Sequence, residues 1–246
     1  SNSDNITDAN SLISGVDLDG YLVSASGEAF NFKLLFNEDN KFDLSGIDSL
    51  VNFTTDPSYG RFSVNLTNSI NVLMLQLTGG FDIFRDNKEN KNTFLRILLN
   101  GGVDLSNITV TPVTTMISEI FIHLCEKDLS NGIAINDLSF DYLLNKSENR
   151  VLKILGPDFS GVNTSFLNKD PYDEIEKAVE ASNNELLKNS KSLLIANYKL
   201  FSIINTVCDT YDASINGFSK EKRKKYRRKC MRKFAKKRFK DYDVSG

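Results

Sequence analysis

The hydrophobic period of the chain changes near its middle. Up to residue 110, apolar residues mostly alternate with polar ones, which is typical of strands with one buried face. After residue 112, they recur every three or four positions, which is typical of helices with one buried face. Thr111 and Pro112 stand at the change and predict an N-cap followed by proline at the first helical position. The pattern therefore predicts an α+β fold with its strands first.

Several short runs in the amino-terminal half are rich in aliphatic and aromatic residues and are separated by Gly, Pro, Asn or Asp. They predict strands at residues 21–25, 29–36, 50–54, 61–66, 71–77, 93–99 and 107–110. The segment Ser26-Gly27-Glu28 predicts a hairpin between the first two runs. No connection is long enough for a crossover helix, so we expect an antiparallel β-sandwich or barrel over residues 1–111.

The carboxy-terminal half predicts helices that dock on this sheet domain. Apolar residues from Val113 to Cys125 follow the i, i+3, i+4, i+7 rule, so we expect one face of this helix to pack on the open face of the sheet. Further helices are predicted at residues 138–144, at residues 149–155, from the Asp170-Pro171 start, and at residues 190–209. We expect these helices to form a domain over residues 112–218.

A net charge of −2 hides opposite charges in two parts of the chain. Residues 220–240 contain 14 Lys or Arg and one acid, which gives +13, whereas residues 1–219 carry 16 basic and 29 acidic residues, which gives −13. Residues 220–240 also lack Gly and Pro and have apolar residues at three- and four-residue spacings, so we expect a basic helical tail over residues 219–246.

Three interpretations of this tail remain open. It could pack its thin apolar seam on the acidic body, bind a polyanion such as nucleic acid or a charged glycan, or lie on an anionic membrane. The residues that would contact a polyanion or partner are Lys222, Arg223, Lys224, Lys225, Arg227, Arg228, Lys229, Arg232, Lys233, Lys236, Lys237 and Arg238.

Candidate metal chemistry is confined to the start of the first predicted strand. Asp17, Asp19 and Gly20 look like the beginning of a Ca²⁺ loop, although the later ligands of an EF-hand are missing. The alternative is a turn that leads into a strand. No other cofactor is indicated. His123 is the only histidine and lies beside an apolar helix stripe, so we expect a partly buried or surface residue there.

Cysteine spacing and sequence motifs argue against several classes of protein. The three cysteines, Cys125, Cys208 and Cys230, form no C-x-x-C pair, and the first two lie in apolar helical patterns, so we expect core residues there. The sequence lacks the phosphate loops G-x-x-x-x-G-K-[ST] and G-x-G-x-x-G and the nucleophile motif G-x-S-x-G, so we expect no enzyme. A glycosidase pair of carboxylates stays open, as does a carbohydrate-binding sandwich with an exposed Tyr21 or Tyr59.

Short motifs suggest a family. They are Gly15-x-Asp17-x-Asp19-Gly20-Tyr21, Thr54-Thr55-Asp56-x-x-Gly60-Arg61-Phe62, Thr78-Gly79-Gly80-Phe81-Asp82 and Val110-Thr111-Pro112-Val113-Thr114-Thr115-Met116. Together they resemble the transthyretin-like or carboxypeptidase-regulatory-like sandwich modules of large bacterial and viral surface proteins, which continue into a helical extension. The resemblance covers residues 13–208 and leaves the basic tail outside. Val23-Ser24-Ala25 departs from the family pattern, in which glycine usually precedes the alanine.

The resemblance implies a non-enzymatic extracellular, cell-surface or virion-surface module for display, adhesion or assembly. We therefore expect a structural protein that associates with itself or with other structural proteins. The alternative is a polyanion-binding protein that acts through its basic tail. A membrane-spanning helix needs about 18 consecutive apolar residues, and no run in the sequence approaches that length. No transmembrane segment is therefore predicted.

Overall fold

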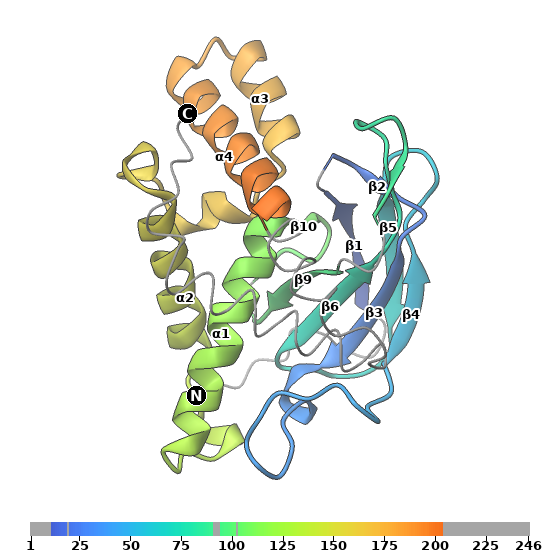
Figure 1. The fold of residues 1–246 in the computed structure, drawn as a ribbon, viewed down its shortest axis with the longest axis vertical. Coiled ribbons are helices and arrows are strands. Elements are labelled where there is room, and N and C mark those ends of the chain that lie inside the picture. The colour runs from blue at the N-terminus through green and yellow to red at the C-terminus, as the bar shows by residue number, and fades with distance from the viewer. Residues whose placement is uncertain (1–10, 19, 91–93, 102, 204–246) are drawn as a thin grey trace.

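The computed structural model describes residues 11–18, 20–90, 94–101 and 103–203 (Figure 1). Its strands lie in the amino-terminal half and its helices in the carboxy-terminal half, which confirms the predicted α+β class. The helices are α1 (Pro112–Ser130), α2 (Phe140–Leu155), α3 (Pro171–Glu180) and α4 (Asn184–Ile203). None of these described helices is long and apolar enough to cross a bilayer.

The strands form two larger sheets and one small one. The four-stranded sheet is antiparallel, in the order β4 (Val51–Thr54), β3 (Ser26–Asn31), β6 (Leu73–Thr78) and β9 (Phe94–Leu99). The three-stranded sheet has the order β10 (Ile108–Val110), β1 (Ser11–Asp17) and β5 (Arg61–Leu66). A small sheet consists of β2 (Leu22–Val23), β7 (Phe81–Asp82) and β8 (Lys88–Glu89).

The four-stranded sheet is the middle layer of the molecule. Leu73, Leu75 and Leu77 of β6 pack with side chains of the three-stranded sheet in one core. Met74 alternates with them and belongs to a second core with residues of α1 and α2. Because both faces are covered, β6 and β9 are almost continuous buried runs. Helix α1 thus docks on the open sheet face, as the periodicity predicted (Figure 1).

Helix α1 begins as its sequence predicted. The Thr111 side chain accepts a hydrogen bond from the Thr114 backbone N–H at 3.0 Å, and the Thr114 hydroxyl accepts one from the Thr111 N–H at 2.9 Å. Pro112 occupies the first helical turn. The Thr115 hydroxyl accepts a hydrogen bond from the backbone N–H of Arg96 on β9 at 2.9 Å. The first turn of α1 is therefore both capped and tied to the sheet.

The predicted hairpin at residues 26–28 is wrong. Strand β2 pairs with β7, whereas β3 pairs with β4 and β6 and already includes Ser26 to Glu28. Gly27 serves close packing there, because a Cβ atom on it would lie 2.2 Å from the Phe53 ring. Beyond Asn31 the chain leaves the sheet in a 3₁₀ turn.

One strand pair departs from the antiparallel arrangement, because β1, which was not predicted, pairs parallel with β10. The chain needs no crossover helix for this pair, because the intervening strands make the connection. The two strands approach closely at Gly15, where a Cβ atom would lie 2.0 Å from the Ile108 carbonyl oxygen.

In the helical half, the two short helices predicted at residues 138–144 and 149–155 are one helix, α2. The residues between the two runs, 145–148, include no Gly or Pro, so nothing there ends the helix. The Ser147 hydroxyl donates a hydrogen bond to the Leu143 carbonyl within it. Helix α4 begins earlier than predicted, at Asn184. The predicted continuation to residue 209 and the basic tail at residues 219–246 lie outside the described residues.

Candidate functional site

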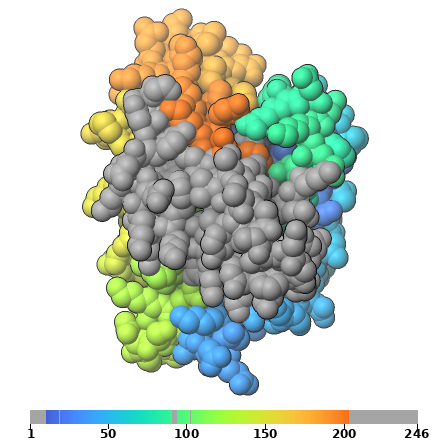
Figure 2. Space-filling view, in the orientation of Figure 1, coloured from blue at the N-terminus to red at the C-terminus, as the bar shows by residue number. Residues whose placement is uncertain are grey.

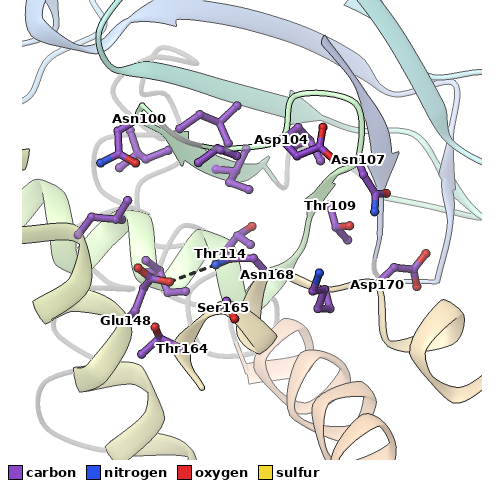
Figure 3. Close-up of a pocket in the computed structure, with 18 of the residues that line it drawn as sticks. Asn100, Asp104, Asn107, Thr109, Thr114, Glu148, Thr164, Ser165, Asn168 and Asp170 are labelled. Carbon is purple, nitrogen blue, oxygen red and sulfur yellow. Dashed lines mark hydrogen bonds between the residues drawn. The ribbon is translucent and has the colours of Figure 1, made fainter. Parts of the chain in front are cut away.

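A cavity of about 390 Å³ opens where the β9–β10 connection faces the helical half (Figure 3). Its walls come from β9, β10, α1, α2, the 3₁₀ segment Thr164–Asn168 and the beginning of α3. The volume is within the range of small-molecule sites. The cavity therefore lies at the junction between the strand half and the helices.

Acidic side chains outnumber basic ones in the lining of the cavity. It includes two lysines and five carboxylates, which are Asp104, Glu148, Asp170, Asp173 and Glu174. One lysine, Lys177, has its ammonium 3.3 Å from a carboxylate oxygen of Glu174. The cavity consequently favours positive over negative ligands.

Glu148 reaches the cavity from α2. Its carboxylate accepts a hydrogen bond from the Asn168 side-chain amide at 3.1 Å, across the gap between α2 and the 3₁₀ segment (Figure 3). Burial raises the pKa of Glu148, and the hydrogen bond from Asn168 only partly offsets that effect. Glu148 is thus a desolvated acid at the cavity wall.

Asp170 is both the N-cap of α3 and part of the cavity wall. One carboxylate oxygen accepts hydrogen bonds from the backbone N–H groups of Tyr172 (2.9 Å) and Asp173 (3.4 Å). The other accepts a hydrogen bond from the Tyr21 hydroxyl at 3.1 Å. Burial and the negative charge of Asp173 raise the pKa of Asp170, and burial together with Asp170 raises the pKa of Tyr21. This contact joins the strand half to the helical half.

Thr109 supplies a hydroxyl from the opposite wall. Its neighbours Ile108 and Val110 are buried in the sandwich core, so strand alternation turns Thr109 toward the cavity (Figure 3). Thr109 is only 2% exposed. Thr109 therefore places a side chain of the strand half on the wall of the cavity.

An aromatic cluster adjoins the cavity at Asp170. The rings of Tyr21, Phe84 and Tyr172 lie with their centroids 5.0 to 5.5 Å apart. Phe84, in the β7–β8 turn, is 56% exposed. Nearby, the Arg85 guanidinium lies 4.4 Å from the centre of the Tyr198 ring on α4. Figure 2 shows the β7–β8 segment beside α4 on the same face of the molecule.

A second polar cluster is sealed between the middle sheet and α1. The Arg96 guanidinium forms an ion pair with Glu119 at 2.8 Å and donates a hydrogen bond to the Gln76 side chain at 2.6 Å. It also lies 4.1 Å from the centre of the Phe94 ring. Arg96 and Glu119 are 1% and 0% exposed, so solvent does not reach them. These groups hold β6, β9 and α1 together and are not placed to meet a ligand.

The predicted Ca²⁺ residues give a mixed result. Asp17 is buried at the end of β1, and burial raises the pKa of its carboxyl well above the usual range. Asp19 lies outside the described residues. Asp82 was not predicted to belong here, yet a Cβ atom on Gly20 would be 2.3 Å from its carboxylate. Within the described ranges, no group of three or more His, Cys, Asp or Glu side chains could hold a metal, and Ca²⁺ binding stays a prediction.

The other predicted residues fall partly in the described chain. Cys125 is buried and free, as predicted, and burial raises the pKa of its thiol. His123 is half-buried on α1, which fits the expected partly buried residue. Cys208, Cys230 and all the predicted polyanion-binding residues, Lys222 to Arg238, lie outside the described residues.

No local motif in the sequence marks the cavity. Asp170 was predicted only as a helix cap, and neither Glu148 nor Thr109 belongs to a pattern of its own. No protein-family model, curated protein or solved structure matches this chain. The transthyretin-like resemblance therefore stays a prediction.

Proposed function

We propose that this chain is a non-enzymatic structural module of a virion or cell-envelope surface that assembles with copies of itself or with other structural proteins. The observation that carries the proposal is the division of charge, −13 over residues 1–219 and +13 over residues 220–240. An acidic body and a basic tail on one chain attract each other between copies, head to tail, at low salt.

The interior of the described chain supports a scaffold role. The buried ion pair between Arg96 and Glu119 joins the middle sheet to α1. The hydrogen bond from Tyr21 to Asp170 joins the strand half to α3. An assembly unit has to keep its two halves in a fixed arrangement, and these contacts serve that need. The resemblance to surface-protein sandwich modules supports the same proposal.

The test measures the mass of the full chain by light scattering at different salt concentrations. We expect a mass above the monomer value of 27.6 kDa at about 0.05 M NaCl, and the monomer mass at about 0.5 M NaCl, where charges are screened within a few ångströms. A monomer at both salt concentrations and high protein concentration would overturn the proposal.

A charge variant identifies the tail as the cause. Replacing the twelve predicted contact residues from Lys222 to Arg238 by glutamine lowers the charge of residues 220–240 from +13 to +1, and should leave a monomer at low salt. The matched control exchanges Lys for Arg and Arg for Lys at the same positions, which keeps the charge. Self-association that survives the glutamine variant would contradict the head-to-tail explanation.

The clustering of basic residues also favours a second function, polyanion binding through the tail. This function predicts retention on immobilised heparin or DNA that weakens steeply as the salt concentration rises. For DNA, the slope of log affinity against log salt concentration should become shallower by about 0.7 to 0.9 for each phosphate that the tail no longer neutralises. The glutamine variant should elute early, and the Lys–Arg exchange should elute like the natural chain. Equal retention of both variants would exclude the tail as the binding element.

A further inference from the structure

We propose that an aromatic face of the body is the docking surface for the basic segment, residues 220–240, of a second copy. The side chains of this aromatic face are Tyr21, Phe84, Tyr172 and Tyr198. The inference rests on the proposed self-association and names the part of the body that receives the tail. The exposure of the rings, a cation already stacked on one of them and an exposed carboxylate beside them favour it.

Two rings of the aromatic face are open to solvent. Phe84 is 56% exposed and Tyr198 is 57% exposed. The Phe84 ring is held in place by Tyr21 and Tyr172, whose centroids lie 5.5 and 5.0 Å from its own. Phe84 belongs to the β7–β8 turn and Tyr198 to α4, and Figure 2 shows these two segments beside each other. Rings that are fixed by packing and still exposed are suited to a ligand that stacks on them.

One cation is already stacked on this face. The Arg85 guanidinium lies 4.4 Å from the centre of the Tyr198 ring, and its Nε lies 3.4 Å from a carboxylate oxygen of Asp82. An aromatic ring attracts a cation because the faces of its π-system carry partial negative charge. The geometry of Arg85 therefore shows that the aromatic face accepts a guanidinium.

Asp173 supplies exposed negative charge beside the rings. It lies exposed in the first turn of α3, and its charge raises the pKa of both Tyr21 and Asp170, so its carboxylate is close to them. Asp82 already pairs with Arg85, whereas Asp173 can meet an incoming cation. Rings alone would suit a neutral sugar equally well, but rings beside an exposed carboxylate favour a cationic partner.

The basic segment has the matching chemistry. Its cations stand next to aromatic residues at Lys225-Tyr226-Arg227, Lys233-Phe234 and Arg238-Phe239-Lys240. The cations can stack on the exposed rings and pair with Asp173, while the aromatic side chains can pack beside Phe84. Residues 204–219 connect the segment to α4, and a chain of this length spans at most about 55 Å. The segment is therefore not confined to the body of its own copy.

The test measures how a fluorescein-labelled peptide of residues 220–240 binds the full chain, by fluorescence anisotropy at about 0.05 M NaCl. We expect Phe84→Leu and Tyr198→Leu each to weaken binding at least about threefold, because leucine keeps an apolar side chain and removes the ring face. Asp173→Asn should weaken binding by a similar factor, because asparagine keeps the shape of the side chain and removes its charge.

Tyr142→Leu is the matched control. Tyr142 is 63% exposed on α2, outside the aromatic face, and the Lys146 ammonium lies 6.0 Å from the centre of its ring. Its replacement should leave the affinity for the peptide unchanged, and a peptide with glutamine at every Lys and Arg should not bind. The inference is overturned if the natural peptide does not bind the natural chain. It is equally overturned if the peptide binds Phe84→Leu, Tyr198→Leu and Asp173→Asn as well as it binds Tyr142→Leu.

Light scattering separates this inference from the proposed function. Self-association of Phe84→Leu should need at least about a threefold higher protein concentration than that of the natural chain. If Phe84→Leu associates like the natural chain, the proposed assembly stands and the aromatic face is not its docking surface. A monomer at every salt concentration would overturn the assembly and, with it, a second copy as the source of the segment, even if binding of the peptide requires Phe84.

Discussion

The buried ion pair between Arg96 and Glu119 gives the sharpest stability prediction. Arg96→Met leaves the Glu119 carboxylate, which is 0% exposed, without the guanidinium 2.8 Å away. Removing one partner of a buried pair costs about 3–5 kcal/mol, because the remaining charge stays desolvated. Loss of the hydrogen bond to Gln76 adds about 1 kcal/mol. The total is a large fraction of the about 5–15 kcal/mol by which domains are stable.

A double-mutant cycle separates the buried charge from the packing. Glu119→Met alone should destabilise the fold by a similar amount, because it leaves the guanidinium buried. The double variant Arg96→Met/Glu119→Met buries no charge, so it should lie within about 1–2 kcal/mol of the natural chain. The two single costs should therefore not add, and the coupling free energy should exceed about 2 kcal/mol.

Urea unfolding followed by circular dichroism measures these free energies, and thermal melting should show a fall of about 6–20 °C for each single variant. Arg61→Met is the matched control, since Arg61 is an exposed residue on β5 and its replacement should change stability by at most about 0.5 kcal/mol. An Arg96→Met cost below about 1 kcal/mol, or additive single costs, would refute the idea that this pair holds the sheet to α1.

Two further predictions concern the junction and a buried acid. Thr111→Ala removes the N-cap of α1 and should cost about 0.5–2 kcal/mol in urea unfolding, whereas Thr111→Ser, which keeps the hydroxyl, should cost less. Burial raises the pKa of Asp17, so Asp17 binds its proton more tightly in the folded protein than in the unfolded chain. The stability that this proton binding contributes is lost as pH rises above about 3.9, the pKa in the unfolded chain, toward the pKa in the folded protein. Asp17→Asn should therefore be more stable than the natural chain at about pH 8, by about 1 kcal/mol or more, and the difference should be smaller near pH 5. The control is Asp48→Asn, which replaces an exposed acid and should show a difference in stability that does not depend on pH. The same lack of pH dependence in Asp17→Asn would contradict this explanation.

Local signals made much of the fold predictable. The alternation in Phe62, Val64 and Leu66 predicted β5, and the Thr111-Pro112 and Asp170-Pro171 pairs predicted the starts of α1 and α3. In each case the sequence forms its own signal, because neighbouring residues decide which face is buried or which N–H is capped. Such elements need no knowledge of the remainder of the chain.

The failures came from residues whose role is set by distant neighbours. Gly27 resembles a turn residue, but it makes room for the Phe53 ring within the sheet. Strand β1 has Gly15 at the point where β10 approaches it. Because glycine has no side chain, it interrupts the alternation of apolar and polar residues that would mark the strand. The cavity follows the same rule, because Thr109, Glu148 and Asp170 each have a local explanation and only the packing of the helices brings them together.

Zero-length cross-linking of mixed copies tests the proposed assembly most directly. Equal amounts of ¹⁴N- and ¹⁵N-labelled full chain are mixed at low salt and treated with a carbodiimide, which joins a carboxylate to a lysine ammonium in contact with it. The proposal predicts cross-links between lysines of residues 220–240 and acids of the body, and in these cross-links one peptide carries ¹⁴N and the other ¹⁵N. The cross-links between differently labelled copies should disappear at high salt. Cross-links that join only peptides of one label, or an absence of tail-to-body cross-links, would contradict it.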